Sequence, residues 1–300
     1  MPNARYFILL LIMTLLFGFS FIASKNALMG LGIFQLIFGR YFFALLIFVF
    51  LFWKRREVYF IDRKDWKDLL LLTLIEPVGY FIFETFGIRF TTPSSVSLII
   101  ATIPVFSMIF SAWILKEKTS FVGILGIMIS ICGIYLIFSW QRQSFLAPNP
   151  LLGNFLTLGA ALSAGLYNVF CRKLTRKYSP ISITFYQTVV ATLFFFPAAL
   201  IETIRRKNVI PDPFIFLNVL YLAVGCSVIA YFILNHSLSR LQASQVAIFS
   251  NLIPVVTIAA SWLFYRELLN LPQLLGAALV ISGTYLTFFH APRTPLTSPE

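Results

Sequence analysis

Two sets of three polar residues, each spaced four positions apart, lie within long apolar stretches of the chain. The two sets are Glu76, Tyr80, Glu84 and Ser227, Tyr231, Asn235. Residues four apart share one face of an α-helix, so each set predicts a polar stripe. An ionisable side chain at the middle of a membrane-spanning helix costs about 2.5–3.5 kcal/mol and usually faces a cavity or a partner. We expect the two stripes to form opposite walls of a polar substrate cavity.

The stripes carry side chains suited to small amphipathic solutes. Tyr80 and Tyr231 each combine an apolar ring with a hydroxyl group. Glu76 or Glu84 could bind a substrate ammonium group or take up a proton coupled to transport. In the alternative interpretation, these carboxylates pair with a cation and only hold helices together.

The cations available for such pairing are also candidates for substrate binding. Arg40 lies within an apolar stretch, where a guanidinium could bind a substrate carboxylate in a bidentate manner. It could instead be a counter-ion for Glu84 or extend to the membrane interface. Lys25 follows Ser20 and Ser24 near the end of the first apolar stretch, where it could contact substrate or be a simple interfacial lysine.

Further polar residues and two prolines fall inside the apolar stretches. Tyr167, Asn168 and Asn251 are candidate cavity-lining residues, although interhelical hydrogen bonding is an alternative role for Asn168. Pro104 and Pro254 lie at mid-span, where proline kinks a helix, and are predicted hinges.

The composition requires that membrane-spanning helices position these residues. Of the 300 residues, 59% are hydrophobic and 11% are charged, whereas soluble domains carry about 25% charged residues. The sequence therefore predicts an all-α polytopic membrane protein with ten transmembrane helices. Their expected limits are 5–27, 33–53, 68–88, 93–114, 120–139, 151–171, 180–201, 214–236, 242–264 and 270–290.

The distribution of basic residues predicts the orientation. If both termini are cytoplasmic, the inner segments hold fifteen Lys and Arg residues and the outer segments seven. This excess agrees with the positive-inside rule, although the outer cluster 205–207 opposes it. The net charge of +12 is therefore interpreted as topology signals and headgroup attraction rather than as nucleic-acid binding.

A self-match at an offset of 150 residues indicates an internal duplication. Residues 91–140 align with 241–290 without a gap, and 14 of the 50 positions are identical. The chain is thus divided into a first five-helix repeat (1–140), a connecting loop (141–150), a second repeat (151–290) and a cytoplasmic tail (291–300). An odd number of spans per repeat inverts the second copy in the membrane, and inverted pairs are typical of alternating-access carriers.

The repeated residues resemble a known family. Its signature is matched by residues 103–105, 113–118 and 133–136, together with Gly123 and Gly126, and again by 253–255, 266–267 and 276–286. These segments are similar to the EamA-type signature of the ten-helix branch of the drug/metabolite transporter superfamily. The resemblance implies a secondary carrier in a bacterial inner membrane, commonly an exporter of amino acids or related metabolites.

Other function classes lack their motifs. The sequence has no H-E-x-x-H, G-x-S-x-G, D-D-x-x-D or Walker A pattern, and its three cysteines form no C-x-x-C pair. We therefore expect no enzyme activity, metal or cofactor. Within transport, exchange of nucleotide-sugar or S-adenosylmethionine-like solutes is the alternative, and the direction, coupling ion and oligomeric state stay open.

Overall fold

The computed structural model describes residues 3–55, 61–117, 120–175, 177–206, 212–238 and 249–289. Every named element within these ranges is helical. The elements are α1 (Asn3–Ala27), α2 (Ile33–Arg55), η1 (Arg63–Asp65), α3 (Trp66–Thr73), η2 (Leu74–Gly79), α4 (Tyr80–Phe90), α5 (Pro93–Ile100), α6 (Ile103–Ile114), α7 (Phe121–Ser139), α8 (Pro150–Thr175), α9 (Pro180–Arg205), α10 (Pro213–Leu220), η3 (Tyr221–Ala230), α11 (Tyr231–Leu238), α13 (Ile253–Tyr265) and α14 (Leu271–Phe289).

The helices agree with a polytopic membrane protein. In the described ranges, eight helical segments are long and apolar enough to cross a bilayer, and α13 and α14 are shorter apolar helices. Three of the expected spans are not continuous α-helices: 68–88 and 214–236 contain the π-helical segments η2 and η3, and 93–114 is divided between α5 and α6. Of the ninth expected span, residues 242–248 lie outside the described ranges.

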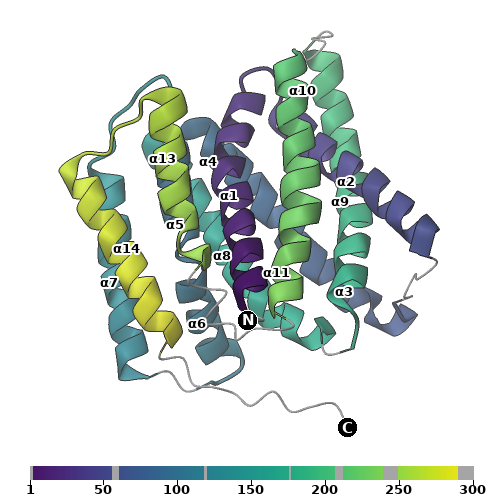
Figure 1. Ribbon diagram of the computed structural model, residues 1–300, viewed down its shortest axis with the longest axis horizontal. Coiled ribbons are helices and arrows are strands. Elements are labelled where there is room, and N and C mark those ends of the chain that lie inside the picture. Colours follow the sequence, from purple (N-terminus) through teal and green to yellow (C-terminus); the bar gives the residue numbers. More distant parts are fainter. Residues whose placement is uncertain are drawn as a thin grey trace.

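The helices pack as an elongated bundle (Figure 1). At one end, α7 lies against α14, and at the other end α2 lies against α9. Between these pairs, α1 contacts α13 and η3, while α8 contacts α4 and α6. In Figure 1, α1 starts and α14 ends at the lower face of the bundle, and α1 ends and α14 starts at the upper face.

Glycine allows α7 and α14 to pack backbone against backbone. A Cβ atom at Gly126 would lie 2.6 Å from the carbonyl oxygen of Gly283, and one at Gly133 would lie 2.7 Å from that of Gly276. In the 150-residue self-match, Gly126 corresponds to Gly276 and Gly133 to Gly283. The contacts are therefore reciprocal between positions that the self-match pairs.

A second pair of contacts has the same reciprocity. A Cβ atom at Gly18 on α1 would lie 2.4 Å from Val256 on α13, and one at Gly165 on α8 would lie 2.6 Å from Cβ of Phe106 on α6. Phe106 and Val256 are 150 residues apart, and Gly18 and Gly165 are matched at an offset of 147. Helices from one half of the chain thus pack into the other half.

Candidate functional site

A break in the third span places the first candidate carboxylate. Glu76 has φ −148° and ψ 125°, outside the helical region, and it precedes Pro77. Proline has no N–H group, and it disfavours the helical conformation of the residue before it. The freed carbonyl oxygen of Glu76 accepts a hydrogen bond from Nε2 of Gln187 on α9 at 2.8 Å. The break therefore holds Glu76 between α9 and the start of α4.

The two predicted stripes meet through a tyrosine and a carboxylate. The hydroxyl of Tyr231, at the start of α11, donates to Oε1 of Glu76 at 3.5 Å. On α4, the Tyr80 hydroxyl donates to Oε1 of Glu84 at 3.2 Å. Tyr80 and Glu84 are buried, while Glu76 and Tyr231 are partly exposed. The structure thus brings four of the predicted residues into one polar cluster.

Arg40 joins this cluster from α2. Its Nε donates to the hydroxyl of Ser227 at 2.8 Å, and its guanidinium carbon lies 4.4 Å from the ring centroid of Phe81. Arg40 is 6% exposed and interacts electrostatically with Glu76 and Glu84. Among the described residues, no carboxylate lies within salt-bridge distance of its guanidinium nitrogens. The cation is therefore close to the carboxylates without a direct ion pair to either.

Two further residues adjoin the cluster. The Tyr167 hydroxyl on α8 donates to Oε1 of Gln187 at 3.3 Å, which links it to the break at Glu76. Phe17 on α1 makes an edge-to-face contact with Tyr231, with 5.5 Å between ring centroids. Gln187 was not among the predicted site residues, although it aligns with Arg40 at an offset of 147. That correspondence is the signal that could have identified it.

The structure places Lys25 away from the cluster. Its ammonium nitrogen lies 2.6 Å from the carbonyl oxygens of Ile88 and Leu146 and 3.0 Å from that of Thr91. An ammonium group has three hydrogens, so these acceptors satisfy it. Lys25 thereby ties the end of α1 to the end of α4 at the upper face.

The other predicted lining residues occupy separate positions. Ser20 donates to the Phe17 carbonyl oxygen on its own helix at 2.6 Å, and Ser24 is buried beside Lys25. Asn168 is exposed and donates to the Ser107 hydroxyl at 2.9 Å, which joins α8 to α6. Asn251 is partly buried in the turn before α13. Asn235 belongs to α11, but its side chain lies outside the described part of the structure.

Pro104 and Pro254 do not kink continuous helices. Each is the second residue of a new helix, α6 or α13, and a turn precedes each helix at 101–102 and 251–252. Proline is compatible with the first helical turn because the N–H groups there have no intrahelical partner. The discontinuity therefore lies immediately before each proline, at positions matched by the repeat.

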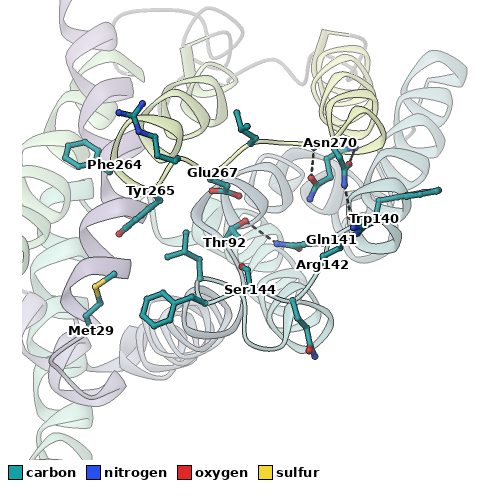
Figure 2. Close-up of a pocket in the computed structure, with 16 residues that line it drawn as sticks. Met29, Thr92, Trp140, Gln141, Arg142, Ser144, Phe264, Tyr265, Glu267 and Asn270 are labelled. Carbon is teal, nitrogen blue, oxygen red and sulfur yellow. Dashed lines mark hydrogen bonds between the residues drawn. The ribbon is translucent and has the colours of Figure 1, made fainter.

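A cavity of ≈ 690 Å³ opens at the upper face (Figure 2). It lies between the turn after α7, the start of α5 and the connection from α13 to α14. On its wall, Oε2 of Glu267 accepts hydrogen bonds from the hydroxyls of Ser94, at 2.8 Å, and Ser261. Glu267 thus joins the start of α5 to the end of α13, as expected for a residue that anchors a loop.

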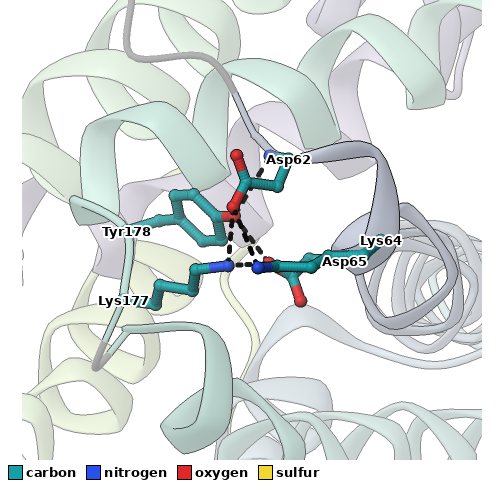
Figure 3. A network of polar contacts seen from close by, with 5 residues as sticks. All are labelled: Asp62, Lys64, Asp65, Lys177 and Tyr178. Atoms are coloured by element: carbon teal, nitrogen blue, oxygen red, sulfur yellow. Dashed lines mark hydrogen bonds and ion pairs between the residues drawn. The ribbon is translucent and has the colours of Figure 1, made fainter.

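A charged network links two connections at the lower face (Figure 3). The Lys177 ammonium contacts the carboxylates of Asp62, at 2.9 Å, and Asp65, and the Tyr178 hydroxyl donates to Asp65 at 2.6 Å. The hydrogen bond and charge of Lys177 lower the pKa of Asp62, and its bonds to the two carboxylates raise the pKa of Lys177. The network holds the segment before α3 against the segment before α9.

Comparisons with known proteins agree with this arrangement. The uncharacterized transporter YcxC of Bacillus subtilis is 28% identical over 286 residues, which cover 92% of this chain and 90% of the relative. A probable amino-acid metabolite efflux pump of Escherichia coli is 27% identical over 292 residues and 94% of both chains. A solved crystal structure with 16% identity and a TM-score of 0.64 shares the fold over 96% of this chain and 98% of the other.

The family comparison covers almost the whole chain. The sequence profile of the EamA-like transporter family matches residues 4–139 and again residues 151–289. This result agrees with the resemblance in the repeated glycine, proline and glutamate positions. The chain belongs to the EamA-like transporter family, a family of membrane transporters.

Proposed function

We propose that the protein is a secondary active transporter that exports small metabolites such as amino acids by alternating access. The observation that carries this proposal is the cluster of Arg40, Glu76, Tyr80, Glu84 and Tyr231 within an apolar helical bundle. A charged side chain inside a membrane-spanning bundle costs free energy unless it faces a transport pathway or pairs with another polar group. The name of the Escherichia coli relative favours amino-acid metabolites as the substrate class.

The cluster has the chemistry to bind both ends of an amino acid. The carboxylates of Glu76 and Glu84 suit a substrate ammonium group, and the Arg40 guanidinium, free of a direct carboxylate partner in the described structure, suits a substrate carboxylate. The rings of Tyr80 and Tyr231 provide apolar surface with hydroxyl groups at the edge. Ser227 and Phe81 hold the guanidinium in place through a hydrogen bond and a cation–π contact.

Two equivalent halves can exchange conformations, which is a common basis of alternating access. We infer ten transmembrane helices in two inverted five-helix repeats, 1–140 and 151–290, related by a pseudo-two-fold axis in the membrane plane. The reciprocal contacts of Gly126 with Gly283 and of Gly133 with Gly276 support this relation, as does the family profile that matches the chain twice. The breaks before Pro104 and Pro254 occupy matched positions and are suitable hinges.

We infer a bacterial inner membrane as the location, with both termini in the cytoplasm. α1 starts and α14 ends at the same face of the bundle (Figure 1), and the expected inner segments carry the excess of basic residues. In this orientation the lower face is cytoplasmic and the cavity lined by Glu267 opens to the outside.

Proton coupling would follow from the two neighbouring carboxylates. Glu76 and Glu84 repel each other electrostatically, and binding of a proton or a cationic group removes this repulsion. A proton and a substrate ammonium would then compete for the same negative charge, which is the basis of exchange between them.

Flux into proteoliposomes with an imposed pH gradient tests this proposal. We expect saturable amino-acid flux that depends on the gradient, and less gradient-driven flux in Glu76→Gln and Glu84→Gln. The Asp68→Asn variant is a matched control because Asp68 lies on α3, two turns before Glu76.

Normal flux and pH dependence in both glutamate variants would contradict coupling, while exchange limited to nucleotide-sugar or S-adenosylmethionine-like solutes would identify a different substrate class. Unsaturable ion current would indicate a channel.

A further inference from the structure

We propose that the upper-face cavity lined by Glu267 is a second solute site, separate from the central cluster, that binds amino acids as zwitterions with an apolar side chain. The assignment of amino acids rests on the proposed function. The location of the site rests on the cavity itself, whose lining includes none of the residues of the central cluster.

Glu267 provides the acceptor for an ammonium group. The hydroxyls of Ser94 and Ser261 both donate to Oε2, and a carboxylate has two oxygens that each accept up to two hydrogen bonds. Oε1 therefore keeps its capacity to accept from a ligand. Figure 2 places the Glu267 carboxylate, Thr92 and Gln141 around the centre of the cavity. Gln141 is itself oriented by Thr92 and Asn154, at 3.2 and 2.8 Å.

The backbone holds this carboxylate in position. Arg266 adopts a left-handed conformation, with φ 56° and ψ 28°, which ends α13 and turns the chain. The amide nitrogen of Glu267 then donates to the carbonyl oxygen of Ser261 at 3.4 Å. The backbone and the side chain of Glu267 are thus both hydrogen-bonded to Ser261. The carboxylate is therefore already oriented before a ligand binds, which lowers the entropic cost of ordering it on binding.

The surrounding charges favour a zwitterion over a simple cation. Arg142 and Arg266 are both exposed residues of the lining, and the Arg266 guanidinium lies over the ring of Trp262, outside the lining. The Lys25 ammonium contacts the carbonyl oxygen of Leu146, another lining residue, and interacts electrostatically with Glu267. The Glu267 carboxylate is therefore near the Lys25 ammonium, and Arg142 adds a second positive charge to the lining. A ligand with a single positive charge is repelled by these cations, whereas the carboxylate of an amino acid is attracted to them.

Aromatic side chains provide the apolar part of the site. Phe145 is 91% exposed and Trp140 is 54% exposed, and both line the cavity together with Phe264 and Tyr265. A volume of ≈ 690 Å³ is in the range of small-molecule sites. The aromatic residues of the lining suit the side chain of an apolar amino acid, and the Glu267 carboxylate suits its ammonium group.

Protection of a cysteine from labelling tests the site directly. Gln143 lines the cavity and is exposed, and Leu271 is an exposed residue near the same connection that does not line it. Gln143→Cys and Leu271→Cys, each in a Cys132→Ser background, are labelled with a membrane-impermeant maleimide in proteoliposomes. We expect saturating L-phenylalanine to slow labelling at position 143 at least fivefold and at position 271 less than twofold. Phenethylamine and 3-phenylpropionate, which each carry one charge, are expected to protect less than L-phenylalanine.

Two carboxylate variants separate binding from loop anchoring. Glu117 occupies the position of Glu267 in the first repeat, follows a left-handed Lys116 and does not line the cavity. In the Gln143→Cys background, Glu267→Gln should raise the half-protecting concentration of L-phenylalanine at least tenfold, and Glu117→Gln should leave it within twofold. Equal losses in both variants, protection at position 271, or no protection at all would overturn the proposal.

A third variant distinguishes this proposal from the proposed function. The double variant Glu76→Gln/Glu84→Gln should lose flux and keep protection at position 143. Loss of protection in that variant would show that labelling reports the central cluster, which would overturn a separate site. Protection in a wild-type protein that carries no amino-acid flux would instead contradict the proposed function and retain the site.

Discussion

Gln187 donates its side-chain amide to the carbonyl oxygen of Glu76 across 2.8 Å, and its own amide oxygen accepts from Tyr167 at 3.3 Å. This carbonyl has lost its helical partner because the chain breaks at Glu76, and the N–H group of Tyr80 donates to the carbonyl oxygens of Ile75 and Pro77 instead. Gln187 therefore completes the hydrogen bonding of the break from a separate helix.

Replacement of Gln187 should disturb the break and the carboxylate that it positions. Gln187→Leu keeps the approximate volume but leaves the Glu76 carbonyl oxygen unsatisfied, at a cost of about 1–3 kcal/mol. We expect about tenfold lower flux and a shifted pH dependence of flux in proteoliposomes. Thr188→Val is the control, because the Thr188 hydroxyl bonds only its own helix, to the carbonyl of Thr184. An unchanged pH profile in Gln187→Leu would restrict Gln187 to a structural role.

Both the planar shape and the charge of the Arg40 guanidinium should contribute to substrate binding. Arg40→Lys retains the positive charge but loses the planar contact with Phe81 and the bidentate geometry for a carboxylate. We expect the apparent KM for an amino acid to rise about tenfold or more, with little change in thermal stability. Ser227→Ala, which removes only the hydrogen-bond partner of Nε, should raise KM less. Wild-type kinetics in Arg40→Lys would exclude bidentate binding.

The α7–α14 contact should tolerate no side chain at its glycines. In Gly126→Ala, the added Cβ lies 2.6 Å from the carbonyl oxygen of Gly283 and 2.7 Å from the amide nitrogen of Thr287, so two backbones must separate. We expect a loss of about 1–3 kcal/mol, measured as a lower Tm in detergent. Gly123→Ala is the matched control on the same helix, because its nearest neighbour is the flexible end of Met108. Equal Tm values for the two variants would contradict the close contact.

The network around Lys177 should be stable at intermediate pH only. The pKa of Asp62 is lowered from its ordinary value of 3.8, so its contribution is present above that value and is lost as pH falls through the lowered pKa. The pKa of Lys177 is raised from 10.5, so its contribution is present below 10.5 and is lost as pH rises through the raised pKa. The window in which both contributions are complete therefore runs from about pH 4 to about pH 10.

Hydrogen exchange of segments 61–65 and 177–178 measures this network. We expect Lys177→Met to increase exchange of both segments, and high salt to have a similar but smaller effect, because these charges are exposed. Lys64→Met is the control, since Lys64 lies 3.7 Å from Asp62 and is 73% exposed. Exchange that is the same in the wild type and in Lys177→Met would show that the loops are held by other contacts.

The regular helices of the fold were predictable because the main requirement for a helix that spans a bilayer is a long apolar stretch of sequence. Long apolar stretches predicted α1, α2, α7, α8 and α9 to within a few residues at most of their ends. The π-helical geometry of η2 and η3 was not predicted, because such a segment depends on how neighbouring helices satisfy the backbone. Pro77 marked one of these breaks, but nothing local marks the start of η3 at Tyr221.

The site was predictable where helical spacing decides which residues share a face. Tyr80 and Glu84 do share a face of α4 and form a hydrogen bond, whereas the predicted stripe is interrupted at Glu76, which the break brings to Tyr231. The assignments of Lys25 and Gln187 depended on tertiary contacts. Lys25 binds carbonyl oxygens in two separate segments, at residues 88–91 and at Leu146, and Gln187 binds a carbonyl freed by a break in another helix. Spacing along one helix contains no information about such acceptors.

The glycine contacts between α7 and α14 limit where the molecule can deform. The backbones of α7 and α14 are in direct contact at these glycines. Even a small sliding of one helix along the other would therefore make carbonyl oxygens and Cα atoms overlap. Aromatic side chains fill the contact between α2 and α9, and side chains of this kind can exchange rotamers. We therefore expect any conformational change to take place away from the α7–α14 end, with these two helices as a stationary frame for the others.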